Sequence, residues 1–245
     1  MSLTAFLLGA LLSGRVIPSG PEVALPVYSC PRIAREIVLD GRMSDPLWKR
    51  APAVSLVDTV SGGPADQPTE VRLLVSATTL YIGFACADDY VWGTKTEPDS
   101  EIYREECVEV FLDPSGGLHR YCEIDVSPKN VVFDALILNP RTPAEPGLPF
   151  AGRKDFHPQG LETRAHVEGD ADRKGGARSW TVEYAIPLAS LTEAPQGPPR
   201  AGDAWRMNLY RIDAPEPGRQ KFYAWNPTGK IDFHRPWRFG VLKFL

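Results

Sequence analysis

The chain has 245 residues, of which 43% are hydrophobic and 24% are charged, and its net charge is −4. This length is sufficient for one large domain with its own core, with two small domains as the alternative. The mildly acidic balance lacks the basic surface that binds nucleic-acid backbones or anionic membranes. The sequence contains no run of 18 apolar residues, so no transmembrane helix is predicted.

Residues 1–27 are expected to form a leader before the domain, which then covers residues 28–245. Residues 3–12 form an apolar run about as long as the hydrophobic part of a signal peptide. No Lys or Arg precedes this run, and no A-x-A cleavage site follows it. Two interpretations stay open. One is a signal peptide or its remnant, which implies a secreted or periplasmic protein, and the other is a disordered leader with a misassigned start.

The cysteines do not form a recognisable motif. Cys30, Cys86, Cys107 and Cys122 are too far apart for the usual zinc or redox spacings. Three of them lie in apolar, strand-like runs, which favours buried free thiols. One disulfide is the alternative if the protein is exported.

Short apolar runs separated by turn residues dominate the sequence after residue 69. Strands are expected at residues 70–76, 80–86, 107–112, 121–126, 131–138, 161–167, 180–186, 205–212, 222–225 and 239–244. Turn-forming stretches such as residues 113–117 (DPSGG) stand between them. Strands of this length and spacing predict an all-β protein, an antiparallel β-sandwich or barrel.

Two segments depart from this pattern. Residues 44–50 (SDPLWKR) predict one or two helical turns, with Ser44 or Asp45 as the N-cap and Pro46 at the first helical position. Residues 139–158 contain five prolines and predict a long surface loop.

Side-chain alternation assigns faces to three of the expected strands. In residues 107–112, the side chains of Val108, Val110 and Leu112 are expected to face the core. The alternation then places Glu109 on the outer face. The same reasoning places Glu123 outside on the next strand, and Asn208 and Tyr210 outside on residues 205–212. A face with carboxylates, an amide and a tyrosine is typical of a ligand surface. An ordinary solvated face is the alternative.

The sequence contains no motif of a common catalytic or nucleotide-binding site, and its four histidines are far apart. Glu105, Glu106, Glu109 or Glu123 could supply a glycosidase-like carboxylate pair. Carboxylates are common on sheets, however, so we expect a protein without catalysis. Residues 88–89 (Asp-Asp) could help to bind calcium or form a plain turn.

Aromatic residues make up 10% of the chain, and several are placed where a ligand could reach them. Five lie at expected strand ends or in loops: Tyr90, Trp92, Tyr103, Trp225 and Trp237. Flat aromatic rings combined with polar hydrogen-bonding groups suit sugars, which have apolar C–H faces surrounded by hydroxyls.

Seven blocks in order resemble the family 9 carbohydrate-binding modules and their family-9-like relatives. They are residues 37–48 (IVLDGRMSDPLW), 69–89, 105–114 (EECVEVFLDP), 121–127 (YCEIDVS), 180–188 (WTVEYAIPL), 205–213 (WRMNLYRID) and 239–244 (FGVLKF). The resemblance covers roughly residues 28–245. It implies a jelly-roll β-sandwich with an opening strand in the first block. It also implies an oligo- or polysaccharide ligand, no catalysis and, in many members, stabilising calcium.

The resemblance also implies roles for individual residues, since the family clamps a terminal sugar between two aromatic rings beside a Glu. Tyr103 takes the place of the first ring, Glu109 falls on the Glu, and Phe233 or His234 takes the place of the second ring. Glu123 stands where the family has Arg, and Tyr210 where it has an amide. Together with the face and aromatic analysis, the predicted carbohydrate-binding residues are Tyr103, Glu109, Glu123, Asn208, Tyr210, Trp225 and His234.

Three further points stay open. Two neighbouring carboxylates repel unless a cation lies between them, and Arg104, Arg211 or calcium could supply it. A structural or interaction module that has lost the sugar site would show an outer face without an organised pocket. A haem-carrying sandwich would use Met207 and His234 as ligands. The sequence does not predict which sugar is bound, or whether the protein recognises the end of a sugar chain or an internal unit. It does not predict the oligomeric state.

Overall fold

The computed structural model describes residues 24–192 and 197–245, so residues 1–23 of the expected leader lie outside the described part. Its strands are β1 (Val27–Cys30), β2 (Val54–Ser55), β3 (Val57–Asp58), β4 (Thr69–Val75), β5 (Thr79–Ala87), β6 (Cys107–Asp113), β7 (Arg120–Val126), β8 (Val132–Leu138), β9 (Ala151–Arg153), β10 (Glu162–Gly169), β11 (Ala177–Pro187), β12 (Ala204–Glu216), β13 (Arg219–Ala224) and β14 (Gly240–Phe244). Four short 3-10 helices accompany them: η1 (Pro46–Arg50), η2 (Ile102–Arg104), η3 (Leu188–Ser190) and η4 (Pro236–Arg238). No helix of the described residues is long and apolar enough to cross a membrane.

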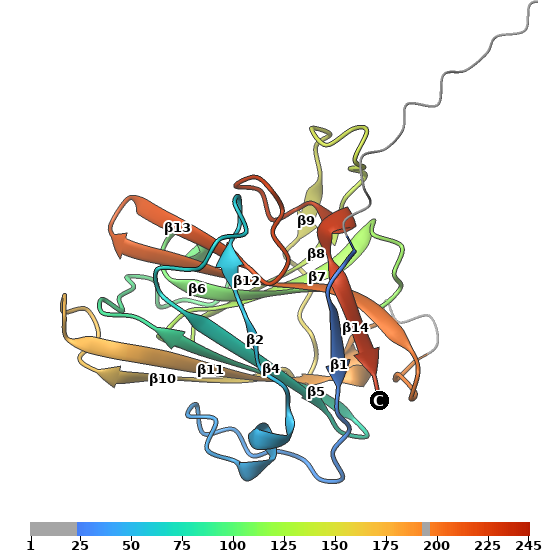
Figure 1. The fold of residues 1–245 in the computed structure, drawn as a ribbon, viewed down its shortest axis with the longest axis horizontal. Helices are drawn as coiled ribbons and strands as arrows, with labels where there is room; N and C mark the ends of the chain where they lie inside the picture. Colours follow the sequence, from blue (N-terminus) through green and yellow to red (C-terminus); the bar gives the residue numbers. More distant parts are fainter. Residues whose placement is uncertain (1–23, 193–196) are drawn as a thin grey trace, which may run out of the picture.

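The strands form two sheets that pack against each other as a jelly-roll β-sandwich (Figure 1). The larger sheet has nine strands in the order β1-β14-β12-β6-β7-β8-β9, with β13 beside β12 and β3 beside β13. The smaller sheet has five, in the order β10-β11-β5-β4-β2. Neighbouring strands are antiparallel except β1 and β14, which run parallel. The predicted all-β class is therefore confirmed.

All ten strands expected from the sequence are present, with ends that differ by a few residues. The short strands β1, β2, β3 and β9 were not predicted. β9 lies inside residues 139–158, where only a loop was expected, because this segment pairs with the edge of β8. The helical prediction at residues 44–50 is confirmed as η1, and Asp45 is its N-cap, since its side chain accepts from the Leu47 N–H.

The opening strand expected within residues 37–48 is absent, and this prediction was wrong. The first strand of the described residues is β1, ten residues earlier. Ile37 instead packs with Trp48 and Tyr81 in a small cluster on the outer face of the five-stranded sheet. Burial of its side chain, rather than pairing of its backbone, fixes this segment.

The main core lies between the two sheets and confirms the predicted alternation. Val110 of β6, Ile124 of β7 and Met207 of β12 all point into it. The four cysteines are free and buried, as the apolar runs around them predict.

Arg211 of β12 connects the two sheets through this core, and its side chain is fully buried. Its guanidinium donates to the carboxylates of Asp88 (2.8 Å) and Asp213 (3.0 Å). It also donates to the hydroxyl of Thr69 at 3.1 Å and to the Ala87 carbonyl at 2.9 Å. The carboxyl of Glu106 belongs to the same cluster as the two aspartates. This one cation therefore serves several buried acids at once.

The outer face of the larger sheet is not an ordinary solvated face. A second apolar cluster covers it, in which Phe111 and Tyr210 of the sheet meet Phe233 and Phe239 from the loop before β14. Glu109 is only 2% exposed there.

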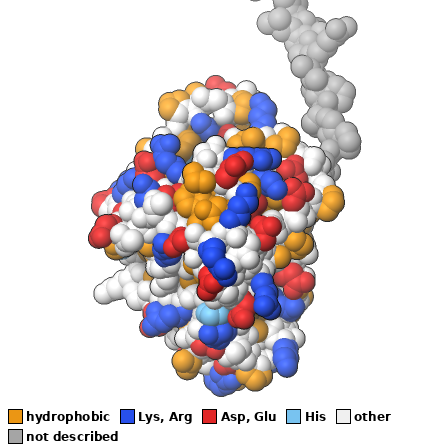
Figure 2. Space-filling view, turned by 90° about the vertical axis from the view of Figure 1, so that its left-hand side faces the viewer, with side chains coloured by type: hydrophobic (Ala, Val, Ile, Leu, Met, Phe, Trp, Pro, Cys, Tyr) orange, Lys and Arg blue, Asp and Glu red, His pale blue; other side chains and the backbone are white. Residues whose placement is uncertain are grey.

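Seen from the side in Figure 2, acidic and basic side chains alternate around a small hydrophobic group, so neither sign of charge dominates the face in view.

Candidate functional site

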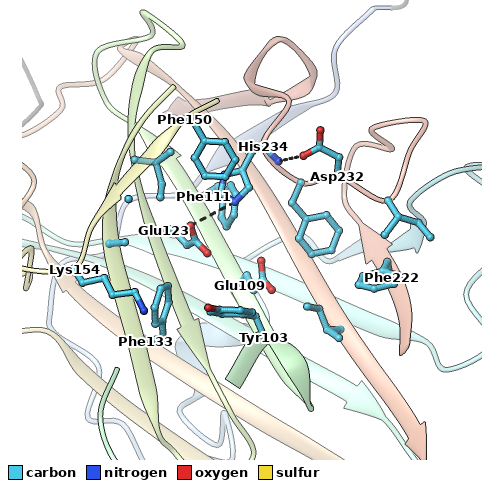
Figure 3. Close-up of a pocket in the computed structure, with 16 residues that line it drawn as sticks. Tyr103, Glu109, Phe111, Glu123, Phe133, Phe150, Lys154, Phe222, Asp232 and His234 are labelled. Atoms are coloured by element: carbon cyan, nitrogen blue, oxygen red, sulfur yellow. Dashed lines mark hydrogen bonds and ion pairs between the residues drawn. The ribbon is translucent and has the colours of Figure 1, made fainter. Parts of the chain in front are cut away.

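A pocket of about 390 Å³ opens on the outer face of the larger sheet (Figure 3). Six segments form most of it, and β12 and β13 add one residue each, Ile212 and Phe222. The strands β6, β7 and β8 contribute its floor, η2 one side, and the segment around β9 and the loop before β14 the remainder. Its labelled residues are Tyr103, Glu109, Phe111, Glu123, Phe133, Phe150, Lys154, Phe222, Asp232 and His234.

Aromatic rings stand on opposite sides of this pocket. Tyr103 packs edge-on against Phe133, with ring centres 5.2 Å apart. His234 lies over Phe150 with ring centres 4.0 Å apart. Figure 3 shows these two pairs at opposite edges of the pocket, with the side chain of Glu123 between them. A flat ligand can thus contact rings on both sides and carboxyl groups in the middle.

The carboxyl groups of the floor are buried and close together. Glu109 of β6, Glu123 of β7 and Asp125 of β7 are 2%, 7% and 0% exposed, and each offers an oxygen within 4.8 Å of the others. Glu109 accepts from the thiol of Cys107 at 3.5 Å, and neither oxygen of Asp125 has a hydrogen-bond partner. Glu109 and Glu123 line the pocket, and Asp125 lies beside them without lining it.

Burial raises the pKa of all three carboxyl groups. It raises the pKa of Glu123 to about 8, although the positive charge of Lys154 acts in the opposite direction. Burial and the charge of Glu123 raise the pKa of Glu109 well above its ordinary range. The pKa of Asp125 is raised in the same way, by burial and then by Glu109. In the empty pocket, protons therefore neutralise much of this charge.

Neither arginine considered for this position lies between Glu109 and Glu123. Arg104 pairs with Glu101 at the surface. Arg211 points to the opposite side of the sheet, into the core between the sheets. Strand alternation explains this, because residues 210 and 211 face opposite ways. Of the three cations considered for this position, neither arginine separates the two acids.

His234 is held in place by a short polar chain. Asn139 donates to the hydroxyl of Tyr121 at 2.9 Å, and this hydroxyl lies 2.9 Å from Nδ1 of His234. Burial lowers the pKa of His234 to about 3, so its ring is neutral at neutral pH. When the Tyr121 hydroxyl donates to Nδ1, the neutral ring of His234 carries its hydrogen on Nε2. This Nε2 lies 3.8 Å from a carboxylate oxygen of Glu123.

A rise in pH from 5 to 8 is expected to destabilise the protein through Glu123. The folded protein holds a proton there that the unfolded chain releases near its ordinary pKa of 4.5. The stabilisation is thus complete below that pKa and is lost as the pH rises through about 8. Glu123→Gln keeps the shape without this titration. It should be about 1–3 kcal/mol more stable than the parent at pH 8, because it removes a buried charge.

Thermal unfolding at pH 5 and pH 8 measures this effect. Glu162→Gln, on the outer strand β10, is the matched control and should behave as the parent does. A pH dependence in Glu123→Gln as steep as that of the parent would contradict the prediction.

The sequence model of the family described as "Carbohydrate family 9 binding domain-like" matches residues 39–245. The chain belongs to this family.

Solved structures of low identity share the fold of this family 9-like domain. A protein of Bacteroides uniformis, described as a candidate carbohydrate-binding protein, superposes with a TM-score of 0.71 at 16% identity. The match covers 91% of this chain and all of that one. A family 9 module of Caldicellulosiruptor kristjanssonii, solved with cellotriose, has a TM-score of 0.61 at 15% identity and covers 89% of this chain and 93% of its own. A family 9 module of the same organism, solved with glucose, has a TM-score of 0.59 at 15% identity and covers 90% of this chain and 95% of its own.

A curated relative is an "Extracellular protein" of Arthroderma benhamiae, which is 29% identical over 178 residues. The match covers 68% of this chain and 73% of the relative.

Four of the seven predicted binding residues of the family 9-like domain line the pocket. These are Tyr103, Glu109, Glu123 and His234. Phe233, the alternative to His234 for the second ring, lines it as well.

The structure places Asn208 and Tyr210 behind the pocket wall. The side-chain amide of Asn208 donates to the hydroxyl of Tyr210 and to the Asn226 carbonyl, both at 2.9 Å. Tyr210 in turn donates to the Phe233 carbonyl at 3.0 Å, and its ring stacks on Phe233 with centres 4.0 Å apart. Both residues are fully buried, so they position the loop that carries Phe233 and His234.

Trp225 lies in the core between the sheets and not beside the pocket. Its position at the end of β13 suggested an exposed ring, but it is only 8% exposed. The indole packs against Gly240 of β14, where the absence of a side chain leaves room for it.

Several pocket residues were not predicted. Phe150, Lys154 and Asp232 come from loops far apart in the sequence, and no local pattern links them. Phe133 lies on β8, and the side-chain alternation that places Glu109 and Glu123 on the outer face would place Phe133 there as well.

The calcium that the resemblance implies does not fit the predicted pair at residues 88–89. One oxygen of Asp88 accepts from Arg211, and the other accepts from the Tyr90 N–H at 2.9 Å. An oxygen of Asp89 accepts from Gln67. Arg211 already supplies a positive charge beside Asp88, and both oxygens of Asp88 accept hydrogen bonds, so this residue is not poised to bind Ca²⁺.

The two residues considered as haem ligands lie on opposite faces of the larger sheet. Met207 points into the core between the sheets, whereas His234 packs on Phe111 and Tyr121 outside. They cannot ligate one iron in this arrangement.

Proposed function

We propose that this protein binds an oligo- or polysaccharide in the pocket, with one sugar ring between Tyr103 on one side and His234 or Phe233 on the other. The observation that carries the proposal is the pocket itself. It combines rings on opposite edges with buried carboxyl groups between them, and it is built from the outer face of a family 9-like domain. A module that had lost its ligand would not need to keep this pocket open.

We further propose that the protein binds its sugar without hydrolysing it. A glycosidase needs one carboxyl group that is ionised and one that carries a proton. Here burial raises the pKa of both Glu109 and Glu123, so neither is held in the ionised form. Of the four glutamates considered for catalysis, Glu105 instead binds Thr94, and Glu106 accepts from the Ala214 N–H.

The proposed location is outside the cytoplasm, secreted or periplasmic. The support is the extracellular name of the fungal relative and the polysaccharide class of ligand, which occurs outside cells. The affinity should be modest, in the micromolar to millimolar range, which corresponds to roughly −8 to −4 kcal/mol.

The test is a calorimetric titration of the full chain with mono- and oligosaccharides, for the parent and for Tyr103→Ala. Loss of one stacking ring should weaken the best ligand by about tenfold or more. Tyr90→Ala, which removes a ring outside the pocket, is the matched control and should bind as the parent does. If Tyr103→Ala is folded and retains full affinity, or if no sugar gives saturable heat, the proposal fails.

A further inference from the structure

The pocket floor is rich in carboxyl groups that form no ion pair with a lysine or arginine of the described residues: Glu109 and Glu123 line it, and Asp125 lies beside them. Glu109, Glu123 and Asp125 bring three carboxyl groups together, and all three are at least nine-tenths buried. Lys154 is the cation of the described residues that lines the same pocket. Its Nζ lies over the ring of Phe133, 5.1 Å from the ring centre. No ion pair between Lys154 and these acids is formed within the described residues.

Asp125 is the most informative of the three acids. It is fully buried, neither of its oxygens has a hydrogen-bond partner, and it faces Glu109 across the β6–β7 pairing. A buried carboxyl group without a partner is costly, because it has lost its water and gained no donor in exchange. Asp125 does not line the pocket, so a ligand would meet Glu109 and Glu123, and a positive charge beside these two would favour the ionised form of Asp125 as well.

The surroundings favour an ammonium group over a metal ion as that donor. An ammonium has three N–H groups to donate, enough for both carboxyl groups that line the pocket, Glu109 and Glu123. A divalent ion such as Ca²⁺ requires six to eight oxygen ligands. The pocket lining beside these acids includes the rings of Tyr103, Phe111 and Phe133, and the thiol of Cys107 lies against Glu109.

We propose that the ligand of this pocket is an amino sugar with a free ammonium group, which binds to Glu109 and Glu123 while the sugar ring lies between the aromatic walls. This inference rests on the proposed function and names its substrate class. The positive charge of the ammonium would lower the pKa of Glu109 and Glu123 and so favour their ionised forms, with Asp125 next to them. N-acetylation of the same sugar would remove the charge and two of the three donors.

The test compares two trisaccharides that differ only in this group, the β-1,4-linked trimer of glucosamine and its fully N-acetylated form, with cellotriose as the neutral reference. In calorimetric titrations of the full chain near pH 6.5, the glucosamine trimer should bind about tenfold more tightly than either neutral trimer. Glu123→Gln keeps the shape of the pocket and should reduce this ratio to about threefold or less. Glu162→Gln on β10 removes an exposed charge of the same kind and should leave the ratio unchanged.

The outcomes separate this inference from the proposed function. Equal or tighter binding of a neutral trimer overturns the amino-sugar assignment and leaves sugar binding intact. Saturable binding of Ca²⁺ alone, with sugar binding abolished by a chelator, also overturns it, because the floor then holds a metal ion. Absence of saturable binding with all three trimers overturns both. A preference for the glucosamine trimer that persists in Glu123→Gln and in Glu109→Gln shows that the ammonium binds elsewhere.

Discussion

Replacement of Arg211 with methionine is expected to lower the free energy of unfolding by about 3–5 kcal/mol. The new side chain has a similar length but no charge. Asp88 and Asp213 would then lose their buried cation, while Glu106 would remain next to them. The hydroxyl of Thr69 and the Ala87 carbonyl would lose their donor as well. Because these groups come from both sheets, the loss would weaken the contact between the sheets.

Chemical denaturation of the purified variant measures this effect. Arg219→Met removes an exposed arginine of β13 that pairs with Glu216 at the surface, and should change the stability by less than about 1 kcal/mol. Equal stabilities of the two variants would show that the buried acids find protons or water at little cost, against the expectation.

Gly240→Ala should also be strongly destabilising, by about 1–3 kcal/mol or more. A Cβ at this position would lie 2.5 Å from Cζ3 of Trp225 and 2.8 Å from the Pro26 carbonyl oxygen. The indole cannot easily move, since it is packed in the core, and the carbonyl belongs to the backbone leading into β1. One added methyl group therefore separates β14 from two neighbours.

The matched control for this substitution is Gly147→Ala. No atom lies within 4 Å of a Cβ built at this loop position, so the change should stay within about 0.5 kcal/mol. A thermal unfolding comparison of the two variants is sufficient. If both unfold at the parental temperature, the tight contact around Gly240 is not a constraint.

Local sequence patterns predicted the strands well because one face of each lies in a shared core. The alternation of β6, β7 and β12 identified Val110, Ile124 and Met207 correctly. It could not show that the opposite face is covered too, since that cover comes from loops distant in the chain. Tyr210 was therefore expected at an open surface, and it is buried.

The candidate site was predictable only as far as it lies on the strands. Register alone brings Glu109 and Glu123 to one face, and the structure places both in the pocket. Phe150 and Asp232 reach it through loops that carry no periodic signal. The misplaced arginine has a simpler cause. Alternation along β12 puts Arg211 on the face opposite to that of Tyr210, so it points away from the pocket.

The parallel pair of β1 and β14 has a consequence for biosynthesis. Val27 pairs with Val241, and β14 is the strand that pairs with β1 within the described residues. A nascent chain emerges from the ribosome with β1 first, long before β14 exists. Until residues 240–244 have been made, β1 has no main-chain partner in the larger sheet, and the edge of β12 stays open. The last strand thus closes the larger sheet, and cotranslational folding must proceed without it for nearly the whole length of the domain.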